Sequence, residues 1–211
     1  MKKPSTTLAR RSALRWVAAL AAPVFIRDLR AQQRLRATPA QTEGPFYPVE
    51  LPADSDFDLL VQGPVSYSHG VPTRLDGSVR DTSGRALRDA VVEIWQCDHL
   101  GHYRHPGDGG RADPAFQGFG RVLADGDGAY RFRTIRPVPY SGRTPHIHFK
   151  VRMGARELLT TQLYVEGDPG NARDGIWRRL SPADRSAVTV PFADDDGAGG
   201  TKARFDIVVA A

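Results

Sequence analysis

Two histidines and two tyrosines give this sequence its clearest chemical signature. His146 and His148 are two residues apart, and residues i and i+2 of an extended segment project from the same face, so both imidazoles point to one side. Tyr140 lies shortly before His146, and Tyr103 lies further upstream. A phenol binds a metal well only when a strongly Lewis-acidic ion holds it as phenolate, far below its free pKa of about 10. Two tyrosines with two histidines therefore indicate ferric iron.

The segments that position these side chains are predicted to be short β-strands. From residue 75 onward, β-prone runs alternate with turn sequences such as Asp125-Gly126-Asp127-Gly128, and no long helical period is present. The strands are expected at residues 76–80, 90–96, 129–134, 146–152, 158–165, 187–190 and 204–210. This number and spacing of strands predict an all-β fold, with a single β-sandwich domain over residues 74–211.

Two segments precede the predicted sandwich. Residues 37–73 are rich in Pro, Gly, Ser and Asp with little periodicity, and they are expected to form an irregular arm rather than a domain. Residues 1–36 carry nine Lys or Arg and one acid, which leaves residues 37–211 at −3 of the net +5. Because nucleic-acid-binding proteins concentrate positive charge on the binding domain itself, this distribution argues against a nucleic-acid partner.

The basic tail has the pattern of an export signal. Arg10 and Arg11 form a twin-arginine pair that precedes a modestly apolar run at 16–26. No later segment reaches 18 apolar residues, so no membrane contact is expected after export. Residues 1–36 are thus predicted to direct the protein to the periplasm or outside the cell. A basic amphipathic helix and an uncleaved anchor are the alternatives.

Four linked motifs resemble the intradiol ring-cleavage dioxygenases, in particular the protocatechuate 3,4-dioxygenase type. They occupy residues 91–96, 101–105, 130–140 and 143–149, in the order of that family. The similarity extends from about residue 41 to about residue 176. The resemblance implies a prealbumin-like β-sandwich and an Fe(III) ion bound by Tyr103, Tyr140, His146 and His148.

The resemblance also implies roles for other residues around the iron. Arg143 corresponds to an arginine over the bound ring, where its permanent charge stabilises developing negative charge. Gln162 corresponds to a glutamine beside the same pocket. The resemblance also implies that the arm at residues 37–73 covers the active site, with Gly44 and Pro45 against the substrate. Ile176 corresponds to a residue of the pocket wall. For Gln162 the alternative is a purely structural hydrogen bond.

The implied reaction uses a catechol and O2. The catechol chelates Fe(III) as a dianion, Tyr140 leaves the metal and accepts a substrate proton, and the ring opens between its hydroxylated carbons to a cis,cis-muconate-type diacid. One departure concerns Gly142, which stands where protocatechuate enzymes place a tryptophan against the ring. The pocket is therefore expected to be wider there, and protocatechuate is in question as the substrate.

The sequence allows two other interpretations. Residues 76–94 also resemble prealbumin-like accessory modules, which predicts an exported binding domain without catalysis. Alternatively, His146 and His148 bind zinc or copper together with His102 or His105. The protocatechuate type often contains two related chains, so a homo-oligomer or a related second subunit is expected.

Overall fold

The computed structural model describes residues 34–195 and 199–210, so the predicted export signal lies outside the described residues except for its last three. In the described part the strands are β1 (Val61–Gln62), β2 (Val65–Ser66), β3 (Pro72–Asp81), β4 (Val91–Trp95), β5 (Phe119–Leu123), β6 (Ala129–Ile135), β7 (His146–Met153), β8 (Arg156–Val165), β9 (Thr189–Val190), β10 (Ala193–Asp195), β11 (Gly200–Arg204) and β12 (Ile207–Val209). The helices are η1 (Pro106–Asp108), η2 (Asn171–Arg173), η3 (Trp177–Arg179) and α1 (Pro182–Val188). Within these ranges no helix is long and apolar enough to cross a membrane.

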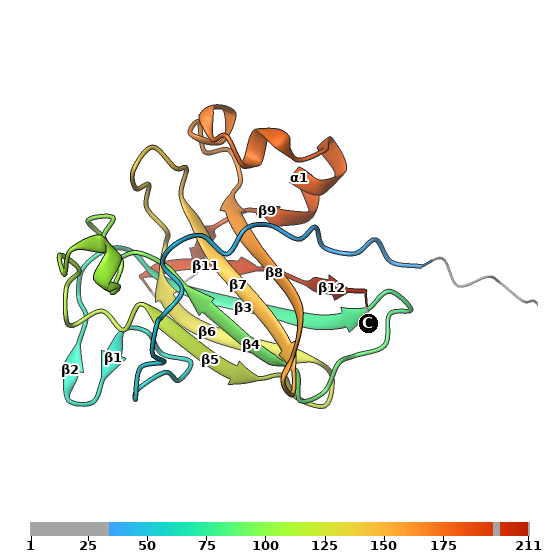
Figure 1. Cartoon of the computed structure of the whole chain (residues 1–211), viewed down its shortest axis with the longest axis horizontal. Coiled ribbons are helices and arrows are strands. Elements are labelled where there is room, and N and C mark those ends of the chain that lie inside the picture. Colours follow the sequence, from blue (N-terminus) through green and yellow to red (C-terminus); the bar gives the residue numbers. More distant parts are fainter. Residues whose placement is uncertain (1–33, 196–198, 211) are drawn as a thin grey trace, which may run out of the picture. The chain divides into compact units, whose positions relative to one another are not determined.

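Two sheets pack face to face around one apolar core. One sheet has the order β5-β4-β7-β8-β9, and the other contains β10-β11-β3-β12 with β6 paired to β3 (Figure 1). Phe132 and Leu75 from one sheet and Ile147 and Phe149 from the other have no exposed surface and belong to the same cluster. Burying such side chains between two sheets is the main source of stability in a sandwich. The predicted all-β sandwich is confirmed.

The seven predicted strands overlap observed ones, but the short strands β1, β2 and β10 are not among them, and three other elements differ. The run predicted at 204–210 is the second part of a longer segment, because β11 and β12 both pair with β3 in one parallel register, with a break at residues 205 and 206. The run predicted at 187–190 begins in α1, which starts because Ser181 caps the amide of Asp184 and Pro182 follows it. Strand β5 was missed because Gly120 interrupts its β pattern.

Gly120 is required by a close approach of the arm to β5. A β-carbon at this position would lie 2.6 Å from Leu59 Cδ1 and 2.9 Å from the carbonyl oxygen of Asp56. The backbone amide of the next residue, Arg121, donates to the carbonyl of Ser55 at 2.7 Å. The glycine therefore allows residues 55–59 of the arm to lie directly against β5.

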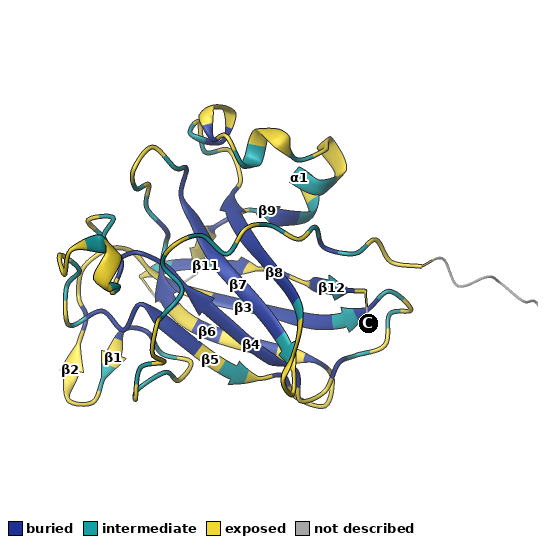
Figure 2. Ribbon diagram, in the orientation of Figure 1, coloured by how far each residue is buried: buried dark blue, intermediate teal, exposed yellow. Residues whose placement is uncertain are grey.

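Strand β7 is buried on both faces (Figure 2). Its odd-numbered residues 147, 149 and 151 enter the core between the sheets, so the alternation of a strand places His146, His148 and Lys150 on the outer face. His148 lies opposite Trp95 of β4 on one side and opposite Gln162 of β8 on the other. These three side chains form a row across the outer face of the sheet.

A second row lies one step further along the same face. Lys150 is opposite Glu93 of β4 and Thr160 of β8, and Glu93 is opposite Arg121 of β5. Lys150 and Glu93 are both buried. Charged side chains are buried on a sheet face only when something covers them and pairs with them.

The irregular arm covers this face. It runs in front of β8 and β7 in Figure 1, and the amide of Gln41 donates to the carbonyl of Thr160 at 2.8 Å. The Gln41 side-chain amide donates to Thr161 Oγ1 and to the Gln162 carbonyl, each at 2.9 Å. The arm also contains the short hairpin β1–β2. The outer face of the sheet is therefore closed by a segment that belongs to neither sheet.

Candidate metal centre

The structure brings together the four side chains predicted to bind metal. His146 and His148 begin β7, Tyr103 lies in the loop after β4, and Tyr140 lies in the loop between β6 and β7. Their ring centroids form a closed circuit, with 4.9 Å between the tyrosines, 5.4 Å from Tyr140 to His146, 4.8 Å between the histidines and 6.1 Å from His148 to Tyr103.

The imidazole nitrogens are spaced as two ligands of one ion would be. His146 Nε2 and His148 Nε2 are 3.2 Å apart. Two nitrogens bound to one metal at ~2.1 Å and near a right angle would be ~3.0 Å apart. His146 Nδ1 donates to the carbonyl of Thr144 at 2.6 Å, which fixes the ring and leaves Nε2 free to bind a metal.

A tight turn places Tyr140 beside Arg143. The amide of Arg143 donates to the carbonyl of Tyr140 at 2.7 Å. The two residues between them, Ser141 and Gly142, have φ of 44° and 76°, the pattern of a type I′ turn. Glycine is favoured at such angles, and a β-carbon at Gly142 would meet nothing within 4 Å. The turn therefore presents a phenol and a guanidinium side by side at an open edge.

Without a metal, the four side chains predicted to be ligands are all uncharged at neutral pH. Burial lowers the pKa of His146 to about 4, and burial together with His146 and Arg143 lowers that of His148 well below its ordinary value. Burial raises the pKa of Tyr103 well above 10 and raises that of Tyr140 against the opposing effect of Arg143. Only a strongly charged cation at the centre would convert both phenols to phenolates.

The polar atoms of this centre fit such a cation. The Tyr103 hydroxyl is buried and has no hydrogen bond of good geometry in the described part of the chain, although the nearby Tyr140 phenol contributes to its raised pKa. Buried polar groups of proteins nearly always have a partner. Two phenols and two neutral imidazoles are a donor set for a hard trivalent ion such as Fe(III), and the orphan hydroxyl is explained if it is a ligand.

The alternative zinc or copper site lacks a third histidine. Within residues 34–195 and 199–210, no three His, Cys, Asp or Glu side chains are grouped so that they could hold a metal. His102 Nδ1 lies 3.4 Å from Asp108 Oδ2, and His105 Nδ1 accepts from the amide of Gly107 at 2.9 Å. Both histidines are thus directed to η1 and its neighbourhood.

Arg143 and Gln162 are directly bonded to each other. Arg143 Nη2 donates to Gln162 Oε1 at 2.7 Å, and Gln162 Nε2 donates to the carbonyl of Thr42 in the arm at 2.8 Å. Arg143 Nε donates to Asp174 Oδ2 at 2.6 Å. Asp174 is fully buried, and its other oxygen accepts from the amides of Ile176 and Trp177. The guanidinium is therefore fixed between the arm and the segment after η2.

Asp174 was not identified from the sequence. It stands in a short polar run, Arg173-Asp174-Gly175, that has the composition of an ordinary surface turn. Burial alone would raise its pKa, but hydrogen bonds from the Trp177 amide and from Arg143 hold the pKa below its ordinary value. Asp174 is therefore an anion that forms an ion pair with Arg143 and holds its guanidinium in place.

Of the predicted arm residues, Gly44 lies closest to the ligands. A β-carbon on Gly44 would lie 3.4 Å from His148 Cε1, and its φ of 75° favours glycine. Pro45 is exposed. The next residue, Phe46, stacks on Tyr103 with centroids 4.5 Å apart and contacts Tyr140 edge-on at 5.9 Å. Phe46 belongs to the predicted arm at residues 37–73, and the sequence alone assigned it no role.

Trp95 is a second aromatic contact that the sequence did not reveal. Its ring stacks on His148 at a centroid distance of 4.8 Å and an interplanar angle of 11°. His148 Nδ1 has no hydrogen-bond partner among the described residues. Stacking on Trp95 therefore orients His148, whereas a hydrogen bond orients His146.

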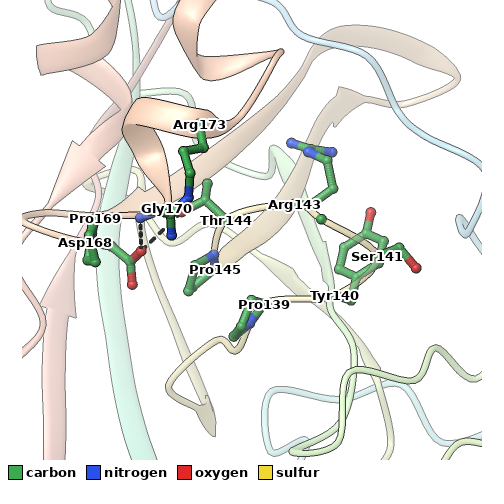
Figure 3. A pocket seen from close by; sticks show the side chains of 11 residues that line it. Pro139, Tyr140, Ser141, Arg143, Thr144, Pro145, Asp168, Pro169, Gly170 and Arg173 are labelled. Carbon is green, nitrogen blue, oxygen red and sulfur yellow. Dashed lines mark hydrogen bonds between the residues drawn. The ribbon is translucent and has the colours of Figure 1, made fainter.

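A cavity of about 340 Å³ opens beside Tyr140 and Arg143 (Figure 3). Residues 139–145 line one side, and residues 168–170 with Arg173 line the other. Gly142 belongs to this lining, and Ile176 does not. Ile176 is half-buried. It connects to the site through a hydrogen bond from its backbone amide to Asp174 Oδ1 at 2.9 Å. The cavity is large enough for a substituted aromatic ring.

Comparison with known proteins finds a dioxygenase family model and dioxygenase relatives. A family model described as Dioxygenase (Dioxygenase_C) matches residues 42–211. The beta chain of protocatechuate 3,4-dioxygenase from Burkholderia cepacia is 37% identical over 147 residues, covering 63% of this chain and 62% of that protein. Hydroxyquinol 1,2-dioxygenase from Corynebacterium glutamicum is 30% identical over 201 residues, covering 82% and 64%. The chain thus spans less than two thirds of the length of these relatives.

The similar solved structures are also dioxygenases. The dioxygenase domain of a dioxygenase–carbohydrate-binding protein fusion from Streptomyces sp. SirexAA-E aligns with a TM-score of 0.65 and 31% identity, covering 82% of this chain and 97% of that one. Hydroxyquinol 1,2-dioxygenase from Pseudomonas putida DLL-E4 aligns with a TM-score of 0.65 and 25% identity, covering 85% and 68%.

The buried histidines predict an acid-sensitive metal-free protein. Since the pKa of His146 is about 4 when folded and about 6.5 when unfolded, the unfolded chain binds a proton between these values that the native state excludes. The free energy of unfolding is therefore unaffected by His146 above pH ~6.5. It decreases as the pH drops toward ~4, by roughly 2 kcal/mol at pH ~5. Urea unfolding of metal-free protein at pH ~7 and ~5 measures this loss.

Replacing the histidine provides the control for this pH dependence. His146→Gln should reduce the loss, and His146→Gln with His148→Gln should remove most of it, because the pKa of His148 is lowered in the same direction. Equal acid sensitivity of the parent protein and the double variant would show that other groups cause it.

Proposed function

Because the chain belongs to the intradiol ring-cleavage dioxygenase family, we propose that it opens the ring of a catechol between its two hydroxylated carbons with O2. The product is a cis,cis-muconate-type diacid that contains both oxygen atoms, so no external reductant is needed. The observation that carries this proposal is the convergence of two phenols and two imidazoles beside an open cavity, where the His146 and His148 Nε2 atoms are 3.2 Å apart.

Fe(III) is the metal we propose for this centre. Tyr103, Tyr140, His146 and His148 would bind it, and the orphan hydroxyl of Tyr103 supports this choice. When bound, Fe(III) would supply the Lewis acidity that lowers the pKa of the catechol hydroxyls and draws electron density from the ring, which would make a ring carbon reactive toward O2. The protein supplies the phenolates, the proton acceptor and the fixed positive charge.

The two tyrosines have different freedom to move. Tyr103 is 2% exposed and lies under the stacked ring of Phe46. Tyr140 is half-buried and belongs to the tight turn at the cavity edge. We therefore assign to Tyr140 Oη the proton of one catechol hydroxyl as the substrate enters. A phenolate that leaves a metal is again the conjugate base of a phenol with a pKa of about 10, which makes it an effective proton acceptor.

Arg143 provides the fixed positive charge. Its bonds to Asp174 and Gln162 hold the guanidinium at the cavity edge next to Tyr140. A preorganised cation stabilises negative charge that develops on the substrate without having to reorient during the reaction. Gln162 positions Arg143 through this contact.

The cavity supports a ring-substituted catechol as the substrate. Gly142 leaves its part of the wall open, since a β-carbon there would meet nothing within 4 Å. Arg173 and Asp168 line the opposite side and give it polar character. A substituent on the catechol would therefore extend into this space.

Oxygen uptake with a panel of catechols tests the proposed reaction. The iron-loaded full chain is expected to consume one O2 per ring opened, to place both atoms of labelled O2 in a diacid, and to use substituted catechols at a kcat/KM within about tenfold of that for catechol. Cleavage outside the two hydroxylated carbons, or O2 uptake that yields hydrogen peroxide without ring opening, would contradict the proposal.

Visible absorption and tyrosine variants test the iron assignment. The iron-loaded protein is expected to be burgundy because of tyrosinate-to-iron charge transfer. Tyr140→Phe should lower kcat at least ~100-fold, the usual effect of removing a general base, and should loosen iron less than Tyr103→Phe does. Tyr67→Phe, which alters a phenol bonded to His99, should leave the band unchanged. A colourless protein that carries stoichiometric iron would refute the tyrosinate ligands.

We further infer that residues 1–36 export the protein by the twin-arginine route. The pair Arg10-Arg11 and the apolar run at 16–26 support this inference. A reporter fused to residues 1–40 is expected to reach the periplasm, and Lys at both positions 10 and 11 should retain it inside. Export that is unaffected by this double substitution would exclude the twin-arginine route. The homo-oligomer or second subunit expected from the sequence stays a prediction.

A further inference from the structure

Lys150 shares its strand face with the two histidines of the metal centre, and its ammonium group is buried. Only 5% of its side chain is exposed, and it lies two residues beyond His148 on the outer face of β7. Burying an ammonium group costs several kcal/mol unless it is paired. The groups that pair with the Lys150 ammonium therefore indicate its structural role.

Two of these partners belong to the arm. Lys150 Nζ forms an ion pair with Glu43 and lies 3.7 Å from the centroid of the Tyr47 ring, a cation–π contact. A third partner, Glu157 of β8, lies 3.5 Å away. One ammonium group thus connects β7 to two arm residues.

Tyr47 is in turn bonded to the second row of the sheet. Its hydroxyl donates to Glu93 Oε2 at 2.9 Å, and Glu93 Oε1 lies 3.5 Å from Arg121 Nε. Burial and the Glu93 carboxylate raise the pKa of Tyr47 to about 12. The phenol therefore remains a donor at all working pH values, and each charge of this row faces an opposite charge or a dipole.

The residues between Glu43 and Tyr47 are those that touch the metal centre. Gly44 lies against His148, and Phe46 stacks on Tyr103. The segment from Glu43 to Tyr47 contains no strand or helix of its own. Side-chain contacts at its two ends therefore have to fix its position.

We propose that Lys150 is a positioning residue that clasps residues 43–47 over the metal centre and so keeps Gly44 and Phe46 against the ligand rings. Its effect on turnover rests on the proposed function, whereas the clasp is a property of the folded chain alone. Loss of the clasp would admit water to the centre and leave Tyr103 without its aromatic cover.

Hydrogen exchange of the full-length protein tests the clasp directly. Lys150→Met keeps most of the apolar stem and removes the charge, and Glu43→Ala removes the arm's carboxylate. Both variants should speed amide exchange in peptides covering residues 41–47 by about tenfold, the factor that corresponds to ~1.4 kcal/mol, with unchanged exchange in β3 and β6. Lys150→Arg should restore slow exchange in part.

Glu157→Ala is the matched control, because it removes a carboxylate partner of Lys150 that lies outside the arm. Arm exchange in this variant should stay within about twofold of that in the parent protein. If Lys150→Met does not fold, Glu43→Ala still decides, since the Glu43 side chain is 42% exposed. Parent-like arm exchange in Glu43→Ala, or equal acceleration in Glu157→Ala, would overturn the clasp.

Iron release and turnover complete the test. Lys150→Met and Glu43→Ala should release iron to a chelator about tenfold faster than the parent and lower kcat/KM more than kcat, because the arm must first close. If the arm loosens as expected but no form of the protein opens catechols, the clasp stands and the proposed function fails. If catechols are cleaved and the arm is unchanged in both variants, the clasp alone fails.

Discussion

The burial of one polar sheet face is the constraint on which the rest of this structure depends. A strand alternates its side chains, so the residues of β7 that fill the core force His146, His148 and Lys150 onto the opposite face. Imidazoles and an ammonium group that are removed from water lose several kcal/mol of hydration each unless they find partners. The irregular arm, the loop tyrosines and the two cross-strand rows supply those partners.

The two rows have different roles. The first supports the proposed metal centre, and the second holds the arm that covers it. In the first row Trp95 stacks on His148, and Gln162 connects Arg143 to the arm. In the second row Glu93 and Lys150 bind the arm through side chains. An arm that lacks a continuous strand ladder belongs to the less stable part of a fold. Charged and aromatic anchors are therefore needed where backbone pairing is absent.

The fold could largely be predicted because most strands carry their own local signal. Strands β3, β4, β6, β7 and β8 combine β-prone residues with turn sequences at their ends. Strand β5 could not be recognised from the sequence. Its Gly120 is needed for a contact with the arm, and a contact between distant segments leaves no trace in the local sequence pattern. Helix α1 was missed because seven residues are too few for a helical period to emerge.

The proposed metal centre and the residues that support it differ in how far each can be recognised from the sequence. His146 and His148 could be proposed as ligands because they are neighbours on one strand and because a metal restricts the residue types that can bind it. Arg143 pairs with Asp174 across 31 residues, and Lys150 pairs with Glu43 across 107. Such separations leave no periodicity, and many other pairs of opposite charge would serve as well. A metal centre therefore constrains its ligands by type, whereas the anchors of its cover are constrained only by complementarity and become visible only once the chain is folded.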